Sequence, residues 1–289
     1  MMEYRTLPHG NEKISVIGIG SSVIGEQKEK DIMETVWYAL EHGVNYFDMA
    51  GGHASIFSAY GKALQEKRKE VMLQVHFGAD YTSGAYGWNI TLEGVKKSVD
   101  WQLANLKTDY IDFGFIHCLD EAADFQKYRD NGVLDYILTL KNQGVIRHIG
   151  LSTHAPALAN AVLDTKLLDM MMFSINPMYD YGQGDYANGS EGERYRLYRR
   201  CAAEGVGISV MKPFSGGQLL HQNTSPFHVA LTTTQCIQYA LDKPGVLTVL
   251  GGPKNVEELK QILSYCHATQ TERDYSMIAT MTPEESGGV

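Results

Sequence analysis

The fold is decided by residues 44–53, which read VNYFDMAGGH. The first half of this stretch is mostly apolar and favours a buried strand, which ends in the carboxylate of Asp48. The glycines that follow let the chain turn out of the strand before helix-like residues resume at Phe57. The stretch therefore predicts a buried parallel strand that presents Asp48 at its carboxyl end, with His53 five residues further on.

Two later stretches end in a comparable way. Residues 71–76 read VMLQVH and residues 110–117 read YIDFGFIH, so each carries a mostly apolar strand to a terminal histidine. The carboxyl ends of parallel strands meet at the catalytic face of an α/β barrel. We therefore expect Asp48, His76 and His117 to converge at that face.

Strand-like and helix-like segments alternate along most of the chain. The expected strands are 16–20, 44–48, 71–76, 110–117, 146–151, 170–175, 205–211 and 246–250, and the expected helices are 31–42, 57–66, 91–105, 131–143, 156–163, 191–204, 233–241 and 256–265. Eight such units are typical of a (β/α)8 TIM barrel, an α/β fold of about 250 residues that would use nearly all of this chain.

The segments outside this alternation define the ends of the expected domain. Residues 4–7 and 13–15 flank the turn PHGN and predict a short hairpin that precedes the first barrel strand and caps the barrel bottom. The polar residues 269–289 predict a weakly ordered tail. We therefore expect a single barrel domain over residues 1–268.

Composition limits the class of partner. The formal net charge of -9 argues against nucleic acid or an anionic membrane as the main partner and favours a small-molecule substrate. No run reaches the roughly 18 apolar residues that a membrane span needs, so a cytoplasmic location is expected. The cysteines are scattered without a CxxC pair, at Cys118, Cys201, Cys236 and Cys266, which predicts buried free thiols.

Two connections are longer than a barrel needs, at residues 78–90 and 176–190. Both follow strands, so they should overhang the catalytic face. Their aromatic residues either line a substrate pocket or pack the loops onto the rim. His154, just past the fifth strand, is expected at the same rim as a substrate contact or in a structural hydrogen bond.

Several of these stretches together resemble the aldo-keto reductase family. They are FDMA at 47–50, DYID to IH at 109–117, and IRHIGLS at 146–152. MKPFSGG at 211–217 is similar to a subgroup that often carries a C-terminal iron–sulfur tail. The resemblance implies hydride transfer between a nicotinamide cofactor, NADP(H) or NAD(H), and a carbonyl or alcohol substrate.

The resemblance also implies the roles of the strand-end residues. The family uses a tyrosine proton donor supported by a lysine, an aspartate and a histidine. Asp48 and His117 match the aspartate and the histidine, whereas His53 stands at the tyrosine position and His76 at the lysine position. An atypical site follows, in which His53 or His117 is the general acid.

The expected cofactor contacts are Ser152, Thr153, Asn176, Lys212, Gly251, Lys254 and Asn255. The segment 251–255 offers backbone amides and one cation at a helix start, which suits a phosphate. Thr153 stands where the family usually has asparagine, and Asn176 where it has glutamine. Leu259 matches an arginine that would favour a 2′-phosphate.

A different class of function uses the same residues. His53, His76 and His117 could bind a divalent ion such as Zn²⁺, Fe²⁺ or Mn²⁺, with Asp48 as a fourth ligand or as an acceptor for a ring N–H. Such a site would support lyase, isomerase or hydrolase chemistry. A third alternative is a barrel without catalytic activity that acts as a binding subunit.

Overall fold

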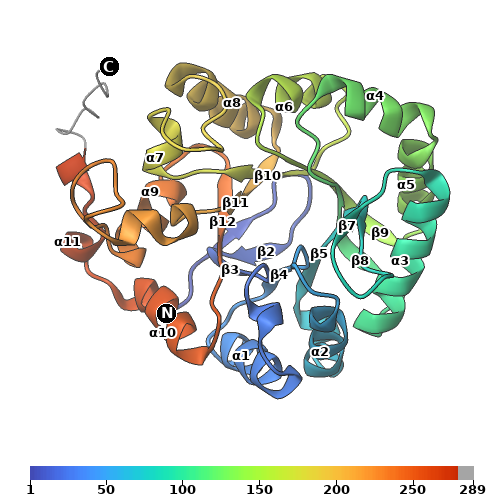
Figure 1. Ribbon diagram of the computed structural model, residues 1–289, viewed down its shortest axis with the longest axis horizontal. Helices are drawn as coiled ribbons and strands as arrows, with labels where there is room; N and C mark the ends of the chain where they lie inside the picture. The colour runs from blue at the N-terminus through green and yellow to red at the C-terminus, as the bar shows by residue number, and fades with distance from the viewer. Residues whose placement is uncertain (279–289) are drawn as a thin grey trace.

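A computed structural model describes residues 1–278 of this chain. The central feature is a closed barrel of parallel strands, β3 (Ile17–Gly20), β4 (Tyr46–Asp48), β5 (Met72–Phe77), β8 (Ile111–Ile116), β9 (Ile146–Thr153), β10 (Met170–Ser174), β11 (Gly207–Met211) and β12 (Val246–Gly251), in that order around the ring (Figure 1). The predicted (β/α)8 barrel is confirmed.

Helices surround the barrel as an outer ring (Figure 1). They are α1 (Glu29–Glu41), α2 (Ser55–Leu64), α3 (Leu92–Leu106), α4 (Ala122–Asp130), α5 (Val133–Asn142), α6 (Pro156–Leu163), α8 (Glu191–Glu204), α9 (Thr233–Leu241) and α10 (Val256–Leu263). The expected helices are all present with small shifts in their ends, and α4 is an addition. It was missed because Phe125 and Tyr128 are its only buried residues, too few for a clear apolar stripe.

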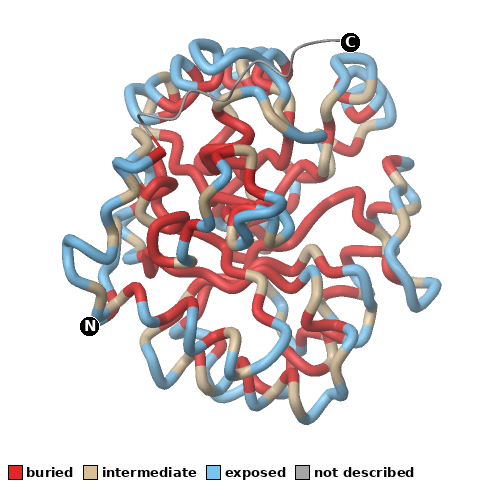
Figure 2. The backbone as a smooth tube through the Cα atoms, turned by 60° about the vertical axis from the view of Figure 1, so that its left-hand side comes forward, coloured by how far each residue is buried: buried red, intermediate tan, exposed pale blue. Residues whose placement is uncertain are grey.

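Local signals fix where these helices begin and end. Ser190 and Glu193 form a reciprocal capping box at the start of α8, and Gly205 ends that helix with a left-handed φ of 73°. Thr91 accepts a hydrogen bond from the Gly94 amide at the start of α3. The buried sides of the helices face the strands, so the buried part of the chain lies at the centre and the exposed part outside (Figure 2).

The amino-terminal hairpin closes the bottom of the barrel. β1 (Tyr4–Thr6) pairs antiparallel with β2 (Lys13–Ser15), as expected. Leu7 and Ile14 beside this pair are fully buried and belong to the same apolar cluster as Tyr46 and Met72, the first residues of β4 and β5. The hairpin therefore seals the end opposite the carboxyl ends of the strands.

Both long loops contain secondary structure. In the first, β6 (Ala79–Asp80) pairs antiparallel with β7 (Gly87–Trp88), which makes a small hairpin above β5. The second contains α7 (Pro177–Asp180). Short strands of two residues carry too few positions for a periodic pattern, so the sequence showed only the length of the loop.

The tail differs from the expectation in its first part. Residues 270–273 form α11 (Gln270–Arg273), which is followed by the 3-10 turn η5 (Ser276–Ile278). The Gln235 side chain donates a hydrogen bond to the Asp274 carbonyl at 2.7 Å, and Ile278 is buried, so this part packs against α9. The rest of the predicted tail, residues 279–289, lies outside the described residues. No helix within residues 1–278 is long and apolar enough to cross a bilayer.

Candidate active site

Three neighbouring strands deliver three polar side chains to one point at the carboxyl end of the barrel. Asp48 ends β4, His76 is the fifth residue of β5, and His117 follows β8, and all three are buried. His76 Nε2 lies 2.7 Å from Asp48 Oδ1, and His117 Nδ1 lies 3.0 Å from His76 Nδ1. The structure therefore joins these residues in one hydrogen-bonded chain.

Gln74 supports this chain from inside the barrel. Its Oε1 accepts hydrogen bonds from the Tyr46 hydroxyl at 2.6 Å and the Ser209 hydroxyl at 3.1 Å. Because two hydroxyl donors fix the amide oxygen, the amide nitrogen faces Asp48 and donates to Oδ1 at 3.0 Å. Gln74 is two residues before His76 and so points to the same side of β5, which was the available signal in the sequence.

The electrostatic surroundings keep the second imidazole neutral. Burial, with His76 and His154 as further contributions, holds the pKa of His117 well below its ordinary value. For an ionised Asp48 and a neutral His76, His76 donates through Nε2 and accepts through Nδ1, so His117 donates through its own Nδ1. This leaves His117 Nε2 as a hydrogen-bond acceptor.

His53 does not join the other three residues. Its side chain is exposed, lies against Gly25, and does not line the cavity described below. Gly51 and Gly52 carry the chain out of the mouth before residue 53, and the His53 backbone pairs with Ala85 of the loop hairpin. The expected convergence of four residues is therefore a convergence of three.

The three-histidine metal ligand set is not assembled for the same reason. Within the described part of the chain, one group of potential ligand atoms lies within 4.8 Å of one another, and it comprises Cys118, Asp120 and His154. Both ring nitrogens of His76 already have hydrogen-bond partners. The geometry is that of a hydrogen-bonded chain.

Asp120 and His154 form a second polar pair at the mouth. Asp120 accepts hydrogen bonds from the Thr153 hydroxyl at 3.0 Å and the His154 amide at 2.6 Å, and its Oδ2 lies 3.0 Å from His154 Nδ1. Although burial alone would raise it, hydrogen bonds from His154 and Thr153 lower the pKa of Asp120. His154 Nε2 is buried and has no partner among the described residues, so it remains open to a ligand.

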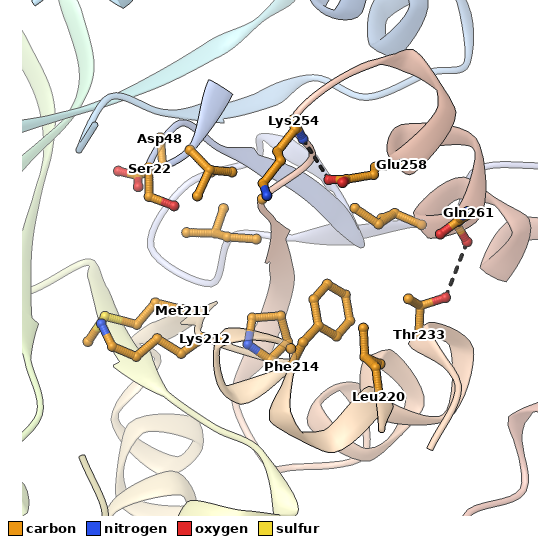
Figure 3. A pocket seen from close by; sticks show the side chains of 18 of the residues that line it. Ser22, Asp48, Met211, Lys212, Phe214, Leu220, Thr233, Lys254, Glu258 and Gln261 are labelled. Carbon is orange, nitrogen blue, oxygen red and sulfur yellow. Dashed lines mark hydrogen bonds between the residues drawn. The ribbon is translucent and has the colours of Figure 1, made fainter. Parts of the chain in front are cut away.

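A cavity of about 1820 Å³ extends from the strand ends toward the outside of the barrel. Asp48, His76 and His117 lie at its inner end. The segment after β11 forms one wall and the segment from β12 to α10 the other, as shown by Lys212 and Lys254 in Figure 3. Its elongated lining, from the barrel mouth to the first turns of α10, suits an extended ligand.

The expected cofactor residues divide into two groups. Ser152, Lys212 and Lys254 line the cavity. Lys212 lies over the Tyr186 ring at 4.2 Å, and burial lowers its pKa, with Cys118 and Asp120 acting in the opposite direction. These three residues are placed to contact a bound ligand directly.

The second group does not line the cavity and instead holds its walls. Asn176 accepts a hydrogen bond from the Tyr179 amide at 2.9 Å and donates to the Lys212 carbonyl at 2.8 Å. The remaining members are Thr153, which bonds Asp120, Gly251, which packs against Ile262, and Asn255, which caps α10. Tertiary contacts thus use the polar groups that the sequence assigned to a cofactor.

The outer end of the cavity carries charges of both signs, from Lys254 and Lys260 and from three glutamates. Glu257 and Glu258 of α10 line it, and Glu258 Oε2 accepts a hydrogen bond from the Lys254 amide at 2.8 Å. Leu259 is fully buried, so α10 offers no cation at that position. No arginine lines the cavity within residues 1–278. On the opposite wall, Gly216 and Gly217 expose open backbone, since an added Cβ would meet nothing within 4 Å.

Comparison with known proteins gives this arrangement a family. The sequence profile of the aldo/keto reductase family matches residues 16–235, which include every strand of the barrel except β12. The chain belongs to the aldo/keto reductase family. Oxidoreductase chemistry with a nicotinamide cofactor is general to this family.

Relatives agree with this assignment over nearly the whole chain. The sequence is 25% identical to the uncharacterized oxidoreductase YqkF of Bacillus subtilis, covering 98% of each chain. It is 26% identical to L-galactose dehydrogenase of Arabidopsis thaliana, covering 90% of this chain and 86% of the relative.

Solved structures match the fold. An aldo-keto reductase from Bacillus halodurans in its holo form superposes with a TM-score of 0.78 at 22% identity, covering 97% of this chain and 96% of that one. An aldo/keto reductase from Klebsiella pneumoniae in complex with NADP and acetate gives a TM-score of 0.68 at 16% identity, covering 100% and 98%. These structures establish that the barrel is of the aldo/keto reductase type.

Proposed function

We propose that this protein is an NAD(P)-linked oxidoreductase that interconverts an alcohol and a carbonyl group through a chain of Asp48, His76 and His117. The hydrogen-bonded carboxylate and two imidazoles at the inner end of the cavity carry this proposal. Neutral imidazoles can accept a proton on one nitrogen and release one from the other. The chain can therefore perform the proton transfer that a tyrosine and a lysine perform in other family members.

The cavity fits a nicotinamide dinucleotide as the cofactor. Ser152, Lys212 and Lys254 would hold it, the lysines through its phosphates, and the exposed backbone at Gly216 and Gly217 would allow a close approach. When bound, the cofactor supplies or accepts the hydride. The protein's own residues orient the cofactor and the substrate, and they supply or accept the proton.

Charge at the outer end favours NAD(H) over NADP(H). The carboxylate of Glu258 would repel a 2′-phosphate, whereas a carboxylate can accept a hydrogen bond from a ribose 2′-hydroxyl. Lys260 of α10 also lines the cavity, where it pairs with Glu257 at 2.6 Å, so the two charges offset each other.

A sugar is the substrate class that we propose. The relative from Arabidopsis thaliana is an L-galactose dehydrogenase by name. In this chain, the unpartnered Nε2 of His154 lies at the mouth next to the proton chain, where it can bind a hydroxyl group of a polar substrate. The structure favours this function over a metal-dependent lyase, isomerase or hydrolase, because His53 lies outside the site.

Binding and turnover measurements on the purified protein test the proposal. NADH and NADPH are titrated by calorimetry, and reduction of NAD⁺ by L-galactose and D-arabinose is followed by absorbance. We expect NADH to bind more tightly than NADPH, and at least one sugar to reduce NAD⁺. Stoichiometric bound metal together with no nucleotide binding would exclude the proposed function.

A further inference from the structure

The tip of the β6–β7 hairpin is attached to the segment that follows Asp48. The Tyr86 amide donates a hydrogen bond to the Gly52 carbonyl, and the Ala54 amide donates to the Gly84 carbonyl, each at 3.4 Å. Between these contacts, His53 and Ala85 form an antiparallel bridge. The hairpin therefore places Tyr86 next to the position where the family has its tyrosine.

A buried contact reinforces this attachment. The fully buried Tyr81 donates a hydrogen bond from its hydroxyl to the Gly51 carbonyl at 2.8 Å. The Tyr81 ring also packs against the Phe57 ring of α2, with 4.7 Å between their centroids. The hairpin tip is thus held both by backbone hydrogen bonds and by the buried Tyr81 side chain.

The Tyr86 hydroxyl ends the proton chain. It lies 2.9 Å from His117 Nε2, the nitrogen that the other hydrogen bonds leave as an acceptor. The Tyr86 phenol therefore donates to His117, which donates to His76, which donates to Asp48. All donors point inward, and each ring nitrogen along the chain has a partner.

The oxygen of Tyr86 is the open end of this chain. His117 lines the cavity, but its two nitrogens are occupied by His76 and Tyr86. Tyr86 itself is not among the residues that line the cavity, but its side chain is partly exposed and its hydroxyl contacts His117, which does line it. A phenol oxygen that donates one hydrogen bond can accept another. A substrate hydroxyl that exchanges a proton with the chain would do so through Tyr86.

We propose that Tyr86 is a catalytic residue that exchanges a proton with the substrate hydroxyl, in place of the tyrosine that the family carries at the position of His53. This inference rests on the proposed function. It also assigns the catalytic phenol to a different loop, since Tyr86 comes from the β6–β7 hairpin after β5 and not from the segment after β4.

The proton balance can be written in the direction of alcohol oxidation. The substrate O–H bond breaks and its proton goes to the Tyr86 oxygen, while the Tyr86 proton moves to His117 Nε2. The Nδ1 proton of His117 passes to His76 Nδ1, and the Nε2 proton of His76 passes to Asp48. The carbonyl forms as the hydride leaves to NAD⁺, so one proton and one hydride leave the alcohol. Carbonyl reduction runs the same transfers backward from protonated Asp48.

The environment of Tyr86 suits transfer of protons without a stable phenolate. Burial, and secondarily the charge of Cys118, raises the pKa of Tyr86 above its ordinary value. The phenol therefore stays protonated at neutral pH, and it must lose its own proton to His117 as it gains one from the substrate.

Removing the hydroxyl tests the role of Tyr86. In Tyr86→Phe, we expect kcat for sugar oxidation to fall by about 100- to 10,000-fold, the usual contribution of general acid–base catalysis. The dissociation constant of NADH should change less than twofold. Trp88→Phe is the matched control on the same hairpin, because this side chain is exposed and lies outside the chain of proton donors. It should leave kcat unchanged.

Imidazole tautomers give a readout that needs neither cofactor nor substrate. Nitrogen NMR of histidine-labelled protein should show the Nδ1–H tautomer for His117 and the Nε2–H tautomer for His76. In Tyr86→Phe, the His117 Nε2 signal should shift to that of a nitrogen without a donor, with the His76 signals retained.

The outcomes separate the two proposals. Retention of full activity by Tyr86→Phe, or an Nε2–H tautomer of His117 in the native protein, would overturn the role of Tyr86 while hydride transfer stands. If the native protein neither binds nucleotide nor oxidises sugars, the proposed function fails. In that case, the tautomer measurement alone tests whether Tyr86 donates a hydrogen bond to His117.

Discussion

At the scale of single residues, the site depends on side chains that satisfy one another. Asp48 receives donors from Gln74 and His76, and His76 accepts from His117. A buried polar group that loses its partner keeps the cost of its lost hydration. Substitutions in this cluster should therefore affect both chemistry and stability, and suitable measurements can separate the two.

His76→Gln should interrupt proton transfer between His117 and Asp48. Glutamine can occupy part of the space and form hydrogen bonds, but its amide does not relay protons as an imidazole does. We expect kcat to fall by about 100- to 10,000-fold and the pH dependence of kcat to change, with the dissociation constant of NADH retained. His42→Gln, at an exposed position on the outside of the barrel, is the control. An unchanged rate and pH profile would show that His76 only packs the strand end.

Gln74→Leu should destabilise the barrel core. Leucine would leave the hydroxyls of Tyr46 and Ser209 without their shared acceptor in a buried setting. We expect the free energy of unfolding to fall by about 1–3 kcal/mol, measured by urea denaturation. Gln74→Glu retains the acceptor atoms but places a second carboxylate beside Asp48, so it should lower activity even where it folds. Equal stability of the leucine variant would contradict this role for Gln74.

At the scale of secondary-structure elements, two of them shape the site beyond the strand ends. The β6–β7 hairpin covers His117, and α10 sets the charge at the outer end of the cavity. The N-terminus of a helix ordinarily attracts anions, but here Glu258 accepts a hydrogen bond from the Lys254 amide just ahead of α10. This contact places a carboxylate at the end of the cavity, where we propose that it disfavours a 2′-phosphate.

Glu258→Gln should improve binding of NADPH relative to NADH. The change removes a carboxylate from the end of the cavity while retaining a side chain of similar size. We expect the NADPH dissociation constant to fall by roughly threefold to tenfold, equivalent to about 1 kcal/mol of repulsion at a surface site. Binding of NADH should change little, and calorimetric titration measures both. Glu34→Gln on α1 is the control, as Glu34 does not line the cavity. A parallel change for both cofactors would show that Glu258 does not discriminate between them.

At the scale of the whole molecule, polar contacts join the bottom hairpin to the barrel wall. His148 Nε2 of β9 lies 3.0 Å from Glu12 Oε1, and His148 Nδ1 lies 3.5 Å from Asp169 Oδ2. Although burial opposes the charged form, Asp169 and Glu12 raise the pKa of His148. The His148 imidazole thus connects segments that are more than a hundred residues apart in the sequence.

Stability should depend on pH through His148. A group whose pKa is raised by folding contributes stability that is fully present below its unfolded pKa, 6.5, and is lost as pH rises through the folded value. His148→Gln should therefore destabilise the protein most at about pH 5.5 and least at about pH 9. Denaturant titrations at both pH values measure the difference. If the variant loses the same free energy of unfolding at both pH values, His148 acts through packing alone.

Asp169 makes the stability of the protein depend on pH in the acid range. Burial would raise its pKa, but hydrogen bonds from His148 and Lys141 lower it to about 2. Its contribution is therefore present above the unfolded pKa of 3.8 and is lost as pH falls toward about 2. Asp169→Asn should accordingly lose stability at neutral pH and show a weaker loss of stability between about pH 5 and about pH 2, measured by denaturant titrations over that range.

The sequence by itself determined the barrel and the strand ends that carry Asp48, His76 and His117. Mostly apolar runs for the strands and amphipathic helices are local patterns, and a closed parallel barrel brings the carboxyl ends of its strands to one face. The polar helix α4 and the two-residue strands β6 and β7 were missed, because they contain too few buried positions to produce such a pattern.

Only the tertiary structure decided which side chains complete the site. His53, five residues after Asp48, turns outward, while Tyr86, more than thirty residues after Asp48, reaches His117. The conformation of the glycine-rich turn and the docking of the hairpin tip determine both positions. These are contacts between loops, and neither loop has a periodic sequence pattern from which the contacts could be predicted. Spacing along the chain therefore identified the residues at strand ends, and packing between loops selected the residue that ends the proton chain.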